Sequence, residues 1–224
     1  MSILQPTPDP VTGRIEWKGS TVWGPAPAVM VSCGPLASPD IVTVSWTGLA
    51  CTRPPMTYIS LRPERFSHGL VRQAGCFVIN FPAASQVYDC DFCGTYTGAK
   101  VDKFARLGLT AVPSATVSAP MIAECPISLS CEVRQIISLG SHDLFVAEIV
   151  GVSVAPDLLD RSGRLRTERA DLLFSMHGAY YGVGRPLGRL GLCTKKQPAP
   201  RSVRPTPAGP KKEKKEQREK RARR

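Results

Sequence analysis

A series of short apolar runs, rich in Val, Ile and other strand-forming residues, is the sequence feature that most constrains the fold. At least six such runs occur, each bounded by Gly, Pro or Asp, residues that commonly end strands. They read AVMVSCG, IVTVSWT, MTYISLR, CFVINFP, ISLSCEV and DLFVAEIVGVSV. Strands this short and numerous predict a mainly β domain built as a closed or partly closed barrel.

The last two runs predict different degrees of burial. Residues 127–133 alternate between apolar and polar side chains, so we expect one face of that strand to lie on the core. Residues 143–154 are almost all apolar or β-branched, which predicts a strand buried on both faces.

Short helices are predicted between some of the strands. The segments SHGLVRQAG, SQVYDCDFCG and AKVDKFARLG end at Gly75, Gly94 and Gly108, and a glycine just past the last periodic residue commonly stops a helix. Ser67 is a suitable N-cap for the first of them. A helix N-terminus with a hydroxyl group and Arg62 nearby suits a phosphate group, although a capped helix beside a surface arginine would look the same.

Almost all of the net charge belongs to the end of the chain. Lys195 and the residues after it hold 13 of the 29 Lys and Arg residues and three of the 18 Asp and Glu residues, a net charge of +10 out of +11. The remainder, at +1, is nearly neutral. The tail is Pro-rich and then basic, and we expect it to be disordered as a solvated segment, or to contact an acidic partner, nucleic acid or anionic lipid.

Neither a membrane span nor a signal peptide is indicated. No run of about 18 apolar residues occurs, and the first residues lack a charged segment followed by an apolar one. We therefore expect a cytoplasmic protein, in which the eight cysteines are buried thiols rather than disulfides. Cys90 and Cys93 form a C-x-x-C pair, but no second pair at a suitable spacing supports zinc. Packing is favoured over a redox or metal role, and no metal site is predicted.

A row of hydroxyl groups is the first candidate for a functional surface. With a period of two, Thr43, Ser45 and Thr47 fall on one face of a strand, opposite Val42, Val44 and Trp46. His142 is the second candidate, because it lies at the turn into a later strand, where a side chain can point into the mouth of a barrel. Read alone, the row could be the wet face of an ordinary strand and His142 a surface histidine.

Several linked segments, in their order along the chain, resemble the flavin reductase-like family, near the flavoredoxins. They include TVSWTGLACTRPPMTYISLRPERFSHGLV, DFCGTYTGAKVDKFARLGLTAVPS, LGSHDLFVAEIVGV and HGAYYGVGRPLGRLG. The resemblance implies an FMN-binding split β-barrel with short peripheral helices, usually a homodimer with the flavin at the subunit interface. It suggests a domain over residues 25–196, between an N-terminal extension (1–24) and the tail (197–224).

The resemblance also implies roles for residues along the flavin. Thr43, Ser45 and Thr47 would supply side-chain or backbone donors to the isoalloxazine and the ribityl chain. Trp46 would form a nearby wall, and Phe174 would pack near the ring.

Four further residues complete the implied site. Ser67 and Arg62 would bind the phosphate, and Lys103 would add positive charge for the phosphate or the ring. His142 would approach from a hairpin of the same or the other subunit, and it is the candidate for tuning the flavin or delivering a proton. Asp40 departs from the family, which commonly has Asn there, and an ionised carboxylate would repel a phosphate.

The resemblance therefore predicts an FMN-binding oxidoreductase. Such proteins use NADH or NADPH to reduce flavin, ferric complexes or a protein acceptor. One alternative is a flavoredoxin-type electron carrier that does not oxidise NAD(P)H itself. The other is a nucleic-acid-associated barrel that uses the basic tail, which the nearly neutral body argues against.

Overall fold

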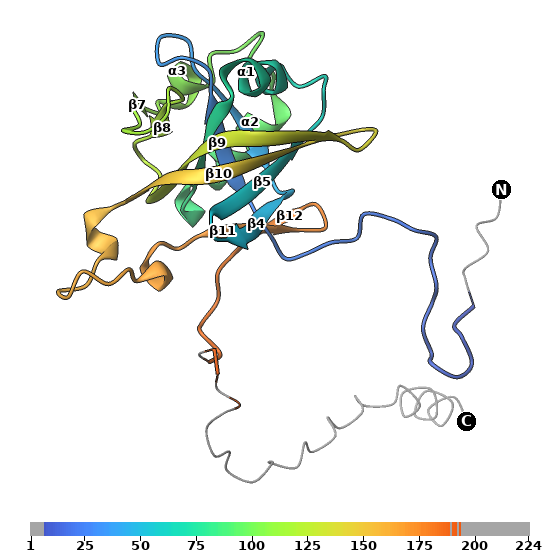
Figure 1. Cartoon of the computed structure of the whole chain (residues 1–224). Coiled ribbons are helices and arrows are strands. Elements are labelled where there is room, and N and C mark those ends of the chain that lie inside the picture. The colour runs from blue at the N-terminus through green and yellow to red at the C-terminus, as the bar shows by residue number, and fades with distance from the viewer. Residues whose placement is uncertain (1–6, 189, 192, 194–224) are drawn as a thin grey trace, which may run out of the picture. The chain divides into compact units, whose positions relative to one another are not determined.

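The computed structural model describes residues 7–188, 190, 191 and 193 (Figure 1). Residues up to Arg185 belong to one compact unit, and the few described residues after it to a second. The predicted tail, residues 197–224, lies outside the described residues. The predicted domain boundaries stay predictions. Among the described helices, none is long and apolar enough to cross a bilayer.

A seven-stranded antiparallel sheet forms the centre of the molecule, in the order β3-β2-β6-β9-β10-β5-β4. Each of the six predicted runs contributes one strand, and the seventh, β4, was not predicted, since the runs include only its first residue. The strands are β2 (Val29–Cys33), β3 (Asp40–Val44), β4 (Thr47–Thr52), β5 (Pro55–Leu61), β6 (Cys76–Phe81), β9 (Ile127–Ser138) and β10 (Asp143–Val154). The edge strands β3 and β4 follow each other in the chain but do not pair, so the sheet curves without closing.

Two smaller sheets accompany the central one. The first has the order β1-β11-β12 and contains β1 (Ala26–Pro27), β11 (Leu173–Met176) and β12 (Ala179–Gly182). The second pairs β7 (Ala111–Val112) with β8 (Met121–Ile122). None of these five short strands belongs to the predicted runs, because runs of two to four residues carry little periodicity.

The three predicted helices are present as α1 (Phe66–Ala74), α2 (Val87–Thr95) and α3 (Lys103–Leu107). Gly75 and Gly108 end α1 and α3 in the left-handed conformation, each with φ 66°, as predicted. Gly94, in contrast, lies inside α2, so the predicted end of that helix is wrong. A Cβ atom at Gly94 would lie 3.1 Å from the Cβ of Thr43, which shows that this glycine lets α2 approach β3 closely. Short 3-10 helices cover Ala84–Gln86, Pro156–Leu158 and Thr167–Arg169.

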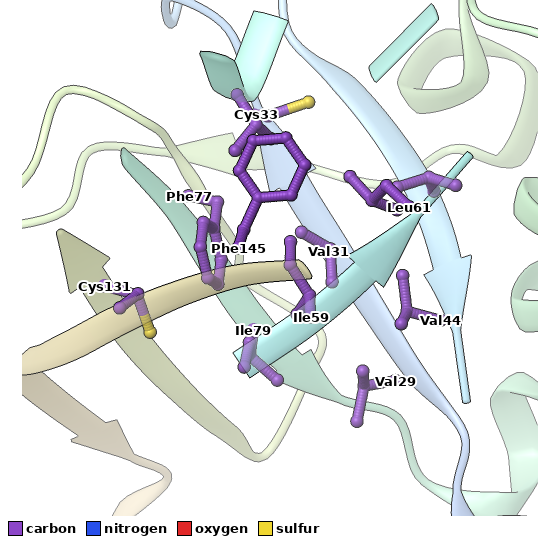
Figure 2. Packing of buried hydrophobic residues seen from close by; sticks show 13 residues of the cluster. Val29, Val31, Cys33, Val44, Ile59, Leu61, Phe77, Ile79, Cys131 and Phe145 are labelled. Carbon is purple, nitrogen blue, oxygen red and sulfur yellow. The ribbon is translucent and has the colours of Figure 1, made fainter. Parts of the chain in front are cut away.

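The main core lies between the strands of the central sheet (Figure 2). Val31, Ile59, Phe77 and Phe145 are fully buried there, together with residues of all the central strands except β4. Strand β10 buries Phe145 on this side, whereas Val152 is 62% exposed. The prediction that β10 is buried on both faces is therefore wrong, because an apolar run alone does not reveal whether a second layer covers it.

Candidate functional site

A groove of about 130 Å³ lies where β3 ends, beside the end of β5, the loop into α1 and the tip of the β9–β10 hairpin. It brings together five of the predicted residues, which are Thr43, Ser45, Trp46, Arg62 and His142. The other lining residues are Val42, Val44, Ser60, Leu61 and Arg65.

The predicted row of hydroxyl groups does not form one strand face, because β3 ends at Val44 and β4 begins at Thr47. The hydroxyl of Thr43 donates to the carbonyl oxygen of Cys90. The hydroxyl of Thr47 donates to the carbonyl oxygen of Tyr58 at 2.6 Å. Ser45 lies between the strands, where its Oγ accepts a hydrogen bond from the hydroxyl of Ser175 at 2.8 Å. Ser45 therefore keeps its own O–H group available as a donor in the groove.

An aromatic contact forms one wall of the groove. The rings of Trp46 and His142 lie 4.5 Å apart at 35°, and Trp46 is 45% exposed. His142 immediately precedes β10, as predicted, and its Nδ1 lies 2.9 Å from the Oγ of Ser141. An indole and an imidazole placed side by side offer a surface for a planar ring.

Two exposed arginines supply positive charge to the groove. Arg62 follows β5 and pairs with Glu64 at 2.7 Å, both side chains being more than half exposed. Arg65 is the N-cap residue of α1, and its Nη1 donates to the carbonyl oxygen of Gly94 at 2.9 Å. Sequence reasoning missed Arg65, although it lies two residues before Ser67 in the segment singled out for phosphate binding.

Ser67 and Lys103 do not line the groove, and both bond to Asp40. Ser67 belongs to the first turn of α1, so its predicted role as N-cap is wrong. It is buried, and its hydroxyl donates to Oδ2 of Asp40 at 2.5 Å. The Nζ of Lys103 lies 3.2 Å from Oδ1 of Asp40 and also donates to the carbonyl oxygens of Ile41 and Cys93. Both side chains thus have partners within the protein, and their predicted contacts with the cofactor stay predictions.

Phe174 lies on β11, where its ring stacks on that of Tyr181 at 5.6 Å and 15°. The residue of β11 that reaches the candidate site is its neighbour Ser175, through the bond to Ser45. The sequence carried no signal for Ser175, because the contact joins residues 130 positions apart.

The C-x-x-C pair is buried in α2, as the packing interpretation predicted. Burial raises the pKa of the Cys90 thiol to about 11 and that of Cys93 to about 12, so both stay protonated and unreactive near neutral pH. All eight cysteines are free, but Cys51 and Cys193 are exposed, so the prediction that all are buried is wrong for these two. Within the described part of the chain, no three His, Cys, Asp or Glu residues gather as they would around a metal ion.

Residues 24–182 match the model of the flavin reductase like domain family. This match covers well over half of the chain, and the chain belongs to this family.

Solved structures of known proteins have a similar fold. The chain is 29% identical to the flavoredoxin of Desulfovibrio vulgaris (Miyazaki F), with a TM-score of 0.76 over 81% of this chain and all of that one. It also resembles the FMN-binding protein from Thermus thermophilus in fold, with 23% identity and a TM-score of 0.64 over 77% of this chain and 97% of that one. The open sheet and these likenesses confirm the predicted split β-barrel.

Curated relatives match over shorter regions. An uncharacterized protein of Archaeoglobus fulgidus is 34% identical over 51% of this chain and 65% of its own length. The reductase component of 4-nitrophenol 4-monooxygenase/4-nitrocatechol 2-monooxygenase of Rhodococcus opacus is 30% identical over 48% of this chain and 55% of its own. The chain thus spans less than two thirds of the length of these relatives.

Proposed function

We propose that the groove binds FMN and that the protein is an oxidoreductase that transfers electrons through the flavin. The observation that carries the proposal is the placement of Arg62 and Arg65 in the same groove as the Trp46–His142 contact. FMN has a phosphate at one end and an aromatic ring at the other, so it needs this combination of cations and ring surface. Membership of the flavin reductase-like family supports the same cofactor.

The donor set fits FMN residue by residue. Guanidinium groups bind phosphate with several parallel hydrogen bonds, and the side chains of Arg62 and Arg65 are exposed enough to do so. The free O–H group of Ser45 can donate to a polar atom of the ribityl chain or the ring. Trp46 would form the wall beside the ring, and His142, whose ring lies against Trp46, is the candidate for tuning the flavin.

The small size of the groove supports a site that a second subunit completes. Pockets that enclose ligands of this size typically measure roughly 300–1,000 Å³, whereas this groove measures about 130 Å³. One chain therefore supplies part of the wall, and we infer that a homodimer completes it. The half-exposed Trp46 would then be covered by the partner and the flavin together.

When bound, the flavin would accept a hydride and pass electrons on, so the protein needs no nucleophile of its own. NADH or NADPH is the proposed donor, and flavin, a ferric complex or a protein is the proposed acceptor. The likeness to a flavoredoxin favours, as the second candidate, a carrier that receives its electrons from another enzyme.

An anaerobic titration separates the two candidates. Protein loaded with FMN is mixed with NADH or NADPH while the flavin absorbance is followed. We expect at least one of the two nucleotides to bleach the flavin absorbance, as fast as a reductase turns over. Flavin that stays oxidised with both nucleotides, yet is reduced by dithionite, would exclude the reductase and leave the carrier.

A further inference from the structure

A buried histidine and a buried aspartate connect two walls of the groove. His68 lies in the first turn of α1, and its Nε2 is 2.9 Å from Oδ2 of Asp143. The two side chains are only 8% and 7% exposed. The ring of His68 also meets that of Phe145 edge-on, with centroids 5.1 Å apart at 77°. Neither His68 nor Asp143 lines the groove itself.

Asp143 closes the tip of the β9–β10 hairpin. It pairs across the sheet with Ser138 on one side and Leu61 on the other. The hydroxyl of Ser138 donates to Oδ1 of Asp143 at 2.5 Å, while Oδ2 faces His68. Within the tip, the N–H of Leu139 donates to the carbonyl oxygen of His142 at 2.8 Å. Both carboxylate oxygens thus hold the backbone next to His142.

The connection joins two groups of groove residues. His142 immediately precedes Asp143 and lies against Trp46. Arg62 and Arg65 lie on the loop just before His68. A bond between His68 and Asp143 therefore sets the position of the hairpin tip relative to the arginine loop.

Packing alone does not explain this pair. Removing polar groups from water costs free energy, and an apolar pair of similar size would stabilise a core as well or better. A hydrogen bond, unlike an apolar contact, depends on distance and angle. The bond between His68 and Asp143 therefore fixes where the hairpin tip lies on α1.

We propose that His68 is a positioning residue that acts through Asp143 to hold the imidazole of His142 against Trp46. This inference rests on the proposed function, because the position of His142 matters only if the groove binds the flavin. His68 itself does not line the groove.

The test measures the placement of His142 in protein without FMN. In a Trp17→Phe/Trp23→Phe background, which removes two exposed tryptophans, Trp46 is the sole indole. Nuclear Overhauser effects between the ring protons of Trp46 and His142 then report the contact. His68→Leu breaks the link from the helix, and Asp143→Ala breaks it from the hairpin. His68→Gln is the rescue, since its amide can still donate to Asp143.

Arg134→Gln is the matched control on the same hairpin. Arg134 pairs with Glu132 on its own strand and with Glu148 on β10, so its replacement removes polar contacts of the hairpin without changing a residue of the tip.

We expect the ring contact to be lost in a folded His68→Leu or Asp143→Ala protein and kept in His68→Gln and Arg134→Gln. The Kd for FMN should rise about fivefold in the two breaking variants only. A ring contact that persists in either folded breaking variant would overturn the proposal, even if that variant unfolds more easily. If the wild type does not bind FMN, the proposed function fails, while the ring contact still decides the role of His68.

Discussion

The Nζ atom of Lys103 lies 3.2 Å from Oδ1 of Asp40, and both side chains are almost completely buried. The hydroxyl of Ser67 donates to the other oxygen of the same carboxylate. This network connects β3, α1 and α3. It also explains how the chain accommodates a buried aspartate, since the carboxylate balances a buried lysine.

Replacing Asp40 tests that balance. We expect Asp40→Asn to lower the free energy of unfolding by about 3–5 kcal/mol, because it leaves the ammonium group of Lys103 buried without a counter-charge. Asp40→Asn/Lys103→Met should recover most of the loss, because it removes the unpaired charge as well. Denaturant unfolding of the three proteins measures both effects. Wild-type stability in the single variant would show that Lys103 does not depend on Asp40.

Gly98 gives a second test of the same region. A Cβ atom at Gly98 would lie 2.2 Å from Oδ1 of Asp40, so the carboxylate would have to move. We expect Gly98→Ala to destabilise the protein by about 1–3 kcal/mol. The control is Gly69→Ala, since Gly69 lies in α1 with nothing within 4 Å of its added Cβ. That variant should gain about 0.5–1 kcal/mol from helix propensity. Equal melting temperatures for the two variants would contradict the packing around Asp40.

Ser45 and Thr47 are expected to respond differently to loss of their hydroxyl groups. Ser45 keeps a free O–H group in the groove, so Ser45→Ala should raise the Kd for FMN about fivefold, as one lost hydrogen bond would. The hydroxyl of Thr47 already donates to Tyr58, so Thr47→Val should cost about 1 kcal/mol of stability and leave the Kd unchanged. Fluorescence titration of flavin measures both Kd values. A larger effect on FMN binding from Thr47→Val than from Ser45→Ala would refute this assignment.

Asp143 predicts an acid-dependent loss of stability. Hydrogen bonds from Ser138, and then from His68, lower the pKa of its carboxyl group. A carboxyl group with a lowered folded-state pKa stabilises the fold above its unfolded pKa of about 4. The contribution disappears as pH falls through the folded pKa.

Ser138→Ala should therefore be less stable than the wild type at neutral pH, and the difference should shrink as pH falls below about 4. Denaturant unfolding across this range, with NMR titration of the Asp143 carboxyl group, checks the prediction. Thr47→Val serves as the control, because it removes a hydroxyl that donates to a carbonyl oxygen rather than to a carboxylate, so its stability difference should not change over this pH range. A stability difference independent of pH would contradict a role for the Asp143 charge.

Local sequence patterns were sufficient to predict six of the seven central strands and the helix ends at Gly75 and Gly108, because β-branched runs and glycine stops act over a few residues. The end of β3 could not be predicted in this way. The chain turns away at Ser45 and Trp46, where the carbonyl oxygen of Trp46 accepts a hydrogen bond from the N–H of Ser60 on β5. The strand boundary thus depends on a partner that the local pattern does not contain.

In the candidate site, too, some features could be predicted from the sequence and contacts between distant residues could not. Trp46, Arg62 and His142 were predicted to face a common site, and the structure places them in one groove. The resemblance to the family implies that Lys103 adds positive charge for the phosphate or the ring of the cofactor, whereas the sequence pattern alone shows only a basic residue on a short helix. Its partner Asp40 lies 63 positions away, so the sequence alone could not reveal that the lysine is buried. The link between His68 and Asp143 spans 75 positions and was missed for the same reason.

The most direct test of the flavin groove compares FMN with riboflavin, which lacks the phosphate, by calorimetric titration. Arg65→Gln removes one groove arginine, and Arg134→Gln removes an exposed arginine outside the groove. We predict that Arg65→Gln raises the Kd for FMN at least about tenfold, as expected for a lost hydrogen bond to a charged group. The same variant should leave riboflavin binding nearly unchanged, and Arg134→Gln should change neither Kd. Wild-type protein that binds no FMN, or an Arg65→Gln protein that binds FMN as tightly as the wild type, would contradict the placement of the cofactor phosphate in this groove.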